Sequence, residues 1–241
     1  MIEKRNVPAA DHTMNTKPWD LTSSQWLVYY WLLSKSNWNS FTKENHYYIY
    51  KNKIVNAQIM RECGIKTQNT IRSAFKKLLE VGAIGESSYA DAYEIYYPEI
   101  YVPLDMRIVK FFISFNKYLD AARMITLYSI FRRIYTFDKG KPFDFTIGLI
   151  ARVLGKAAQG IDRPSILLML SIFEFAGLVK IVKVPYNNNL GKPCIRYTLI
   201  EISDSGEGLD AYFNEEDDID DIDTLEKKAA EILGKLKEIK Q

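Results

Sequence analysis

Residues 56–84 constrain the fold more than any other stretch of the chain, because their apolar residues recur at helical spacing on both sides of a glycine. Gly64 stands where a tight turn would need a positive φ angle. Thr67 is placed to cap the helix that follows. That helix has one apolar stripe, formed by Ile71, Ala74, Phe75, Leu78 and Leu79. The helix before it is expected to place Ala57, Met60 and Cys63 inward, with Ile59 close to that face. The pattern predicts a helix-turn-helix.

The second helix of this motif has a polar and basic outer face. Seven residues of the turn and the helix form it: Lys66, Thr67, Gln68, Asn69, Arg72, Ser73 and Lys76. Arg, Asn and Gln are the side chains best suited to paired hydrogen bonds with base edges, and a helix with such a face fits the major groove. The pattern therefore favours contact with double-stranded DNA over two alternatives, a solvated helix face and a protein-binding surface.

The residues around the motif complete a winged helix. A helix is predicted at residues 21–33, a strand rich in aromatic residues at 46–50, and a β-hairpin after Ile84 that returns at 92–97. Helix, strand, two helices and a hairpin in this order predict a winged-helix domain over residues 18–97. Residues 1–17 show no periodicity and are expected to be a flexible arm or an edge segment.

The same order recurs after a connector at residues 98–104, which predicts a second winged-helix domain over residues 105–202. A helix at 121–135 precedes a short strand around Phe143, and a helix at 147–154 precedes one that Asp162 and Pro164 would start. Two alternating strands then flank a long turn. The fold class is therefore α+β, mainly helical, with two winged-helix domains in tandem and a C-terminal helix.

The second recognition helix differs from the first, since residues 163–175 are apolar almost all round and a helix of this kind is usually buried on several sides. In this domain, base contacts would be made by the start of the helix and by the wing, which is formed by the two following strands and the long turn between them. The residues concerned are Arg163, Ser165, Lys180, Lys183, Lys192 and Arg196. Alternatively, the domain would bind phosphate groups or form a protein interface.

The charge distribution also divides the chain. Residues 1–92 hold twelve Lys and Arg against eight Asp and Glu, and residues 105–200 hold fifteen against six. Residues 201–241 hold five against fourteen, so two basic units precede an acidic tail. Basic units favour a polyanionic partner through counterion release. In the tail, residues 203–223 have the composition of a disordered acidic linker.

The chain ends in a predicted amphipathic helix over residues 224–241. Its apolar stripe needs burial: Leu225, Ala229, Ile232, Leu233, Leu236 and Ile239. The near-heptad spacing favours pairing in a homodimer, or contact with a partner protein, over docking on the chain's own domains. Removal of residues 204–241 is expected to leave both domains folded.

Composition excludes several other classes of protein. No apolar run reaches the roughly 18–20 residues of a membrane span, and the first residues lack the apolar core of a signal peptide. Cys63 and Cys194 have the pattern of reduced thiols, which fits a cytoplasmic protein. His12 and His46 are too scattered for a metal site, and the sequence contains no catalytic constellation and no phosphate-binding glycine motif. We expect no enzyme activity, metal, cofactor or membrane partner.

The chain resembles the tandem winged-helix replication initiator proteins of plasmids and related mobile elements. The likeness covers roughly residues 20–200 and rests, in the first unit, on residues 21–33, the aromatic strand and the motif that ends at Ile84. In the second unit it rests on residues 124–130 and 147–155 and on the next helix. The resemblance implies binding to repeated or palindromic origin sequences and recruitment of a host replication protein, here through the C-terminal helix. Transcription repressors share these folds, and an adaptor that contacts only proteins is the alternative of a different class.

Overall fold

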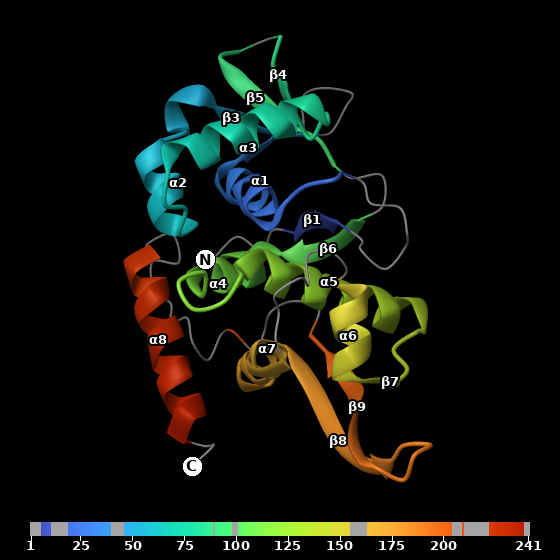
Figure 1. Cartoon of the computed structure of the whole chain (residues 1–241). Helices are drawn as coiled ribbons and strands as arrows, with labels where there is room; N and C mark the ends of the chain where they lie inside the picture. The colour runs from blue at the N-terminus through green and yellow to red at the C-terminus, as the bar shows by residue number, and fades with distance from the viewer. Residues whose placement is uncertain are drawn as a thin grey trace.

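The computed structural model describes residues 6–10, 19–39, 46–88, 90–97, 101–154, 163–203, 209 and 222–238. In these residues the chain has a mainly helical α+β fold with antiparallel sheets and a C-terminal helix, which confirms the expected fold class at this level. Figure 1 shows a molecule whose two ends differ: the helix-turn-helix lies at one end and a long hairpin at the other.

The first end of the molecule is built from three helices and a four-stranded sheet. The helices are α1 (Ser23–Lys35), α2 (Asn56–Glu62) and α3 (Gln68–Glu80), with the 3-10 turn η1 (Lys51–Lys53) before α2. The strands are β2 (Asn37–Asn39), β3 (His46–Tyr50), β4 (Ile84–Glu86) and β5 (Ala92–Ile95), and they pair in the order β2-β3-β5-β4. The two helices of the motif, the strand before them and the hairpin after them are therefore present where the sequence predicts them.

The second end repeats this order of elements. Its helices are α5 (Ala121–Phe137), α6 (Ile147–Val153) and α7 (Arg163–Phe175), and its strands are β7 (Phe143–Phe145), β8 (Val179–Asn187) and β9 (Pro193–Ile202). The sheet order is β7-β9-β8, so the last strand lies between the other two, as β5 lies between β3 and β4. Asp162, the expected cap of α7, lies outside the described residues.

The two ends are joined more closely than a connector at residues 98–104 would imply. Strand β6 (Tyr101–Asp105) pairs antiparallel with β1 (Asn6–Ala10), so these two segments form a two-stranded sheet beside α4 (Met106–Ser114). Residues 26–33 of α1 are all buried, because α1 packs on α3 and also on α4 and α5. A helix that is apolar all round needs cover on several sides. The buried residues of α1 therefore belong to one apolar cluster that includes residues from both ends of the molecule.

Helix α8 (Ile222–Glu238) packs on α4 and α7 of its own chain. Figure 1 shows it along the side of the molecule, with its first turn close to α2. Leu225, Ala229, Ile232 and Leu236 are buried there, while Ile239 lies outside the described residues. The sequence favoured a second copy or a partner protein as the cover for this stripe, whereas the structure covers it intramolecularly. The physical reason is that α4 is buried over nearly its whole length and needs α8 as one of its walls.

Candidate nucleic-acid interface

The outer face of α3 is exposed as the sequence predicts. Gln68, Asn69, Arg72, Ser73 and Lys76 are all exposed, and so are Lys66 and Thr67 before them. The buried stripe consists of Ile71, Ala74 and Leu78, with Phe75 half-buried against Tyr93 at a ring-centroid distance of 5.8 Å. These residues place the polar face of α3 away from the core.

Two details of the predicted packing are wrong. Leu79 is 37% exposed, at the margin of the buried stripe of α3. In α2 the inward residues are Ile59 and Glu62, followed by Cys63, while Ala57 is exposed and Met60 half-buried. Ile59 and Cys63 are one helical turn apart, so the short helix is rotated from the expected orientation.

The turn between α2 and α3 has the predicted geometry. Gly64 has a φ angle of 62°, in the region that glycine adopts without a steric penalty. The amide of Ile65 donates to the carbonyl oxygen of Met60 at 3.0 Å, which closes the end of α2. Thr67 caps α3, because its side-chain oxygen accepts a hydrogen bond from the amide of Thr70 at 3.2 Å. Both residue-level predictions, the glycine turn and the threonine cap, are confirmed.

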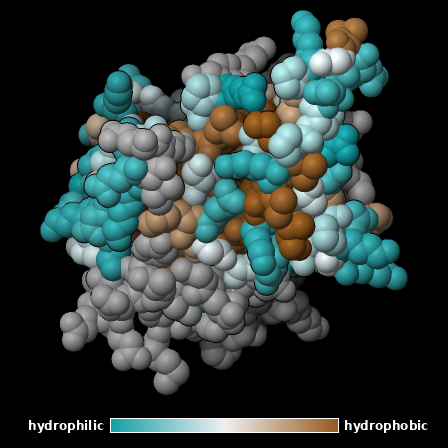
Figure 2. Space-filling model, turned by 90° about the horizontal axis from the view of Figure 1, so that it is seen from below, coloured by the Kyte–Doolittle hydropathy of each residue, from teal (hydrophilic) through white to brown (hydrophobic). Residues whose placement is uncertain are grey.

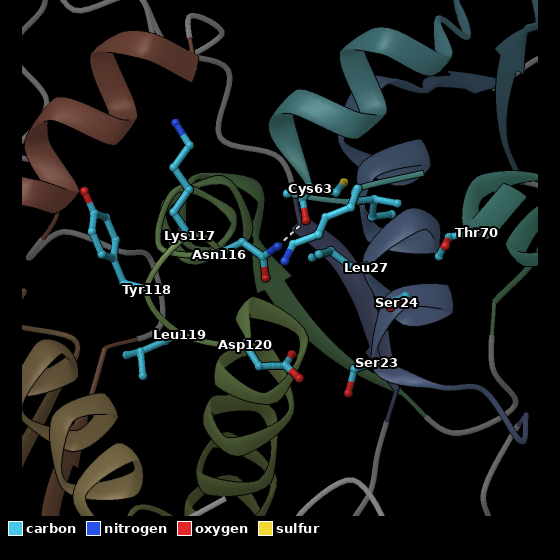
Figure 3. Close-up of a pocket in the computed structure, with 13 residues that line it drawn as sticks. Ser23, Ser24, Leu27, Cys63, Thr70, Asn116, Lys117, Tyr118, Leu119 and Asp120 are labelled. Atoms are coloured by element: carbon cyan, nitrogen blue, oxygen red, sulfur yellow. Dashed lines mark hydrogen bonds between the residues drawn. The ribbon is translucent and has the colours of Figure 1, made fainter. Parts of the chain in front are cut away.

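Asn116 attaches this turn to the rest of the molecule. Its Nδ2 donates to the carbonyl oxygen of Cys63 (Figure 3). Its Oδ1 accepts from the amide of Ala121 at 3.1 Å, at the start of α5. A Cβ atom on Gly64 would lie 2.9 Å from Asn116 Nδ2. The sequence gives no local signal for this contact, because 53 residues separate its two partners.

A buried carboxylate fixes α2 against α1. Glu62 accepts hydrogen bonds from Trp31 Nε1 at 2.7 Å and from Gln58 Nε2 at 2.6 Å, and Lys35 Nζ lies 3.4 Å from it. These three groups satisfy the Glu62 carboxylate, whose charge would be costly to bury alone. Next to it, burial raises the pKa of the Cys63 thiol, and the charge of Glu62 adds to this effect. Cys63 therefore stays protonated near neutral pH, which argues against a nucleophilic role.

Two cavities flank the motif. One of about 500 Å³ lies between the α2–α3 turn, the start of α1 and the loop before α5, and Figure 3 shows Ser23, Asn116 and Asp120 among its lining residues. The other, of about 320 Å³, lies between α3 and β5 and is lined in part by Arg72, Phe75 and Tyr93.

Lys51 lines the smaller cavity but is held by its neighbours. Its Nζ lies 2.5 Å from Glu86 and 3.4 Å from Asp91, and 5.1 Å from the centroid of the Tyr93 ring. The hydrogen bond to Glu86 raises the pKa of Lys51. For Arg72, in contrast, the structure gives an exposed side chain beside an aromatic hollow.

Helix α7 offers no comparable polar face. Arg163 is exposed at its first residue and Ser165 is half-buried, while Ile166, Met169, Leu170, Ile172 and Phe173 are buried. Figure 2 views the molecule from the end where α7 and the β8–β9 hairpin lie, and it shows hydrophobic residues gathered in one area there.

The β8–β9 hairpin carries the remaining predicted residues. Lys180, Lys183 and Lys192 are exposed. Arg196 is also exposed, but its Nη1 lies 3.3 Å from Asp144 Oδ2 and its guanidinium group lies 4.9 Å from the centroid of the Tyr186 ring. Figure 1 places this hairpin at the opposite end of the molecule from α3. The predicted residues thus form two separate surfaces.

Neither a metal site nor a helix that could cross a membrane is found among the described residues. Among them, no three His, Cys, Asp or Glu side chains are grouped as ligands for a metal ion. None of the described helices combines the length and the apolar composition needed to cross a membrane. Comparisons with models of protein families, with curated proteins and with solved structures found no match to the chain.

Proposed function

We propose that the chain binds double-stranded DNA through two winged-helix units, with α3 as the helix that enters the major groove. The observation that carries this proposal is the face of α3: Gln68, Asn69, Arg72, Ser73 and Lys76 are all exposed on a helix whose start is capped and whose preceding turn is fixed. The shared order of elements in both ends, and the shared position of the last strand in each sheet, support the winged-helix assignment.

The role that fits best is replication initiation at repeated origin sequences of a plasmid or a related mobile element. This role rests on the resemblance of the two tandem units to such initiators. A transcription repressor is the second candidate, because the same folds serve both roles. In either role the partner is double-stranded DNA.

An adaptor that contacts only proteins is less well supported by the chemistry of α3. The centres of protein–protein interfaces are depleted in charged residues and enriched in aromatic ones. The outer face of α3 has the opposite composition, since amide, hydroxyl and cationic side chains form it. This is the set of groups that hydrogen-bonds base edges and phosphates.

The first test measures binding of the full chain to a labelled random duplex by fluorescence anisotropy over a range of salt concentrations. Phosphate contacts predict a steep, log-linear loss of affinity as salt rises. Absence of measurable binding even at low salt would contradict the proposal and favour the adaptor.

The second test is selection of bound duplexes from a random pool. Repeated or palindromic half-sites in the selected pool are the expected result. A bound pool without enrichment would remove the claim of sequence specificity and leave only binding to the DNA backbone.

Arg72→Ala then tests direct readout on the selected duplex. We expect a loss of about 1–3 kcal/mol on that duplex and a smaller loss on random DNA, if Arg72 pairs with a base edge. Lys237→Ala is the matched control, because it removes one positive charge from the exposed last turn of α8, far from α3 (Figure 1). Equal losses on both duplexes would show that Arg72 contacts only phosphate.

A further inference from the structure

The tip of the β8–β9 hairpin presents a large apolar side chain to solvent. Leu190 is 80% exposed, more than any other large apolar side chain in the part of the chain that the structure describes. The hairpin that carries it extends from the body of the molecule, as Figure 1 shows. A leucine in this position contributes nothing to the core of its own chain.

The backbone of the tip is held firmly by hydrogen bonds. Asn188 Oδ1 accepts from the amides of Leu190 and Lys192 at 2.9 and 3.0 Å, and the amide of Asn188 donates to the carbonyl oxygen of Lys192 at 2.9 Å. Gly191 has a φ angle of 70°, and its amide donates to the carbonyl oxygen of Asn188 at 2.8 Å. The turn therefore presents Leu190 outward in a fixed position, which lowers the entropy cost of inserting it into a partner.

The charge of the hairpin indicates which partner it fits. The hairpin, residues 179–202, contains four Lys and Arg and one acidic residue, Glu201, which lies at its base opposite Lys180. Lys180, Lys183 and Lys192 are exposed on this segment, and Lys192 lies two residues from Leu190. An extended arm with cations along its length and an apolar tip matches a polyanion that also has an apolar interior, as the stacked bases of a duplex have.

Resting on the proposed function, we propose that the β8–β9 hairpin enters the minor groove and that Leu190 inserts between two base pairs and kinks the duplex. Asn187 and Asn189 are exposed beside Leu190 and carry amide groups that can hydrogen-bond the acceptors on the groove floor. A two-stranded ribbon is wide for a minor groove of about 6 Å. Unstacking by an apolar wedge opens the groove and bends the duplex by about 20–90°, which relieves this mismatch.

The test uses the full chain and a selected duplex with a donor and an acceptor dye at its ends. Binding of the unaltered protein is expected to raise the energy-transfer efficiency, since a kink brings the ends together. Leu190→Ala should abolish this rise and keep the affinity within about tenfold, whereas Leu190→Phe should preserve it because a larger wedge remains. Phe137→Ala is the matched control, because Phe137 is 72% exposed at the end of α5, outside the hairpin, and its loss should change nothing.

The outcomes separate this proposal from the proposed function. If the unaltered protein binds duplex DNA and Leu190→Ala bends it equally, the wedge is wrong while DNA binding stands. If the unaltered protein binds no duplex, both proposals fail. If Leu190→Ala bends DNA normally but no longer sediments with anionic lipid vesicles, the hairpin belongs to a membrane surface and the wedge is overturned.

Discussion

Gly64 is subject to two constraints, a positive φ angle and a close neighbour. Gly82 has only the first of them, so the two glycines can be compared. Gly82 has a φ angle of 70° with nothing within 4 Å of an added Cβ, whereas at Gly64 that atom would lie 2.9 Å from Asn116 Nδ2. Asn116 cannot swing away freely, because it also bonds the Cys63 carbonyl and the Ala121 amide.

We expect Gly82→Ala to lower the free energy of unfolding by about 1–2 kcal/mol from backbone strain alone. Gly64→Ala should cost about 1 kcal/mol more through the disturbed hydrogen bonds, measured by urea unfolding. Equal effects would show that Asn116 does not restrain the turn.

Glu62 allows a second comparison at the scale of one residue. Glu62→Ala leaves the buried Trp31 N–H without its acceptor and Lys35 without its nearby carboxylate, so we expect a loss of about 1–3 kcal/mol in the free energy of unfolding. Glu62→Gln keeps an oxygen that can accept from Trp31 and should cost less. Both are measured by urea unfolding followed through tryptophan fluorescence, to which Trp31 itself contributes. A Gln variant as unstable as the Ala variant would show that the charge, and not the hydrogen bond, holds α2 in place.

Residue-level predictions succeeded where the cause was local. The turn glycine and the cap of Thr67 depend on residues within a few positions, so composition and spacing are enough to find them. The contacts of Glu62 with Trp31 and of Asn116 with Cys63 span 31 and 53 residues, and nothing in one sequence identifies such pairs. The same limit explains the error at Ala57, since the orientation of a seven-residue helix is set by what it packs on.

At the scale of elements, α8 reverses an expectation. Ile232 is 2% exposed and belongs to the same apolar cluster as α4 and α7. Ile232→Ala should therefore lower the free energy of unfolding of the whole chain by about 2–5 kcal/mol. Glu231→Ala, on the adjacent exposed position, is the control and should change it by less than about 0.5 kcal/mol. An unaltered unfolding curve for Ile232→Ala would restore the interpretation of α8 as a tethered helix that binds elsewhere.

Apolar periodicity predicts that a helix forms and has a buried face, but it does not predict which surface buries that face. The spacing of Leu225, Ala229, Ile232 and Leu236 required that some surface bury them, and four buried side chains agree. Which surface does so depends on α4, whose residues 106–114 lie where we predict no helix from the sequence. Strand β6 was missed for a related reason, because its pairing partner β1 begins nearly a hundred residues earlier. An amphipathic pattern indicates that a helix face must be buried, whereas only the complete fold shows which element buries it.

At the scale of the whole molecule, the two ends that the sequence predicts as separate domains share their apolar contacts. One apolar cluster extends from α1 through α4 and α5 to α7, and β1 pairs with β6 between the two ends. Two ion pairs connect α8 to the rest of the molecule: Arg61 at the end of α2 lies 3.8 Å from Asp223, and Lys117 in the loop after α4 lies 2.5 Å from Glu226. Exposed pairs of this kind contribute little, so the shared apolar burial is the main coupling.

This coupling predicts a single unfolding transition, and the tryptophans provide a probe for it. All four tryptophans, Trp19, Trp26, Trp31 and Trp38, precede residue 39, so tryptophan fluorescence reports on the first end and on the contacts of α1, while far-UV circular dichroism reports on helices of both ends. If the apolar cluster is one cooperative unit, both probes should give the same midpoint and the same slope in urea. Two independent domains would instead give separate midpoints, with the fluorescence curve displaced from the dichroism curve.

The Ile232→Ala variant sharpens the test, because its substitution lies far from every tryptophan in sequence yet should shift both curves equally. A shift confined to the dichroism curve would show that the two ends unfold independently, as the tandem-domain interpretation of the sequence supposed.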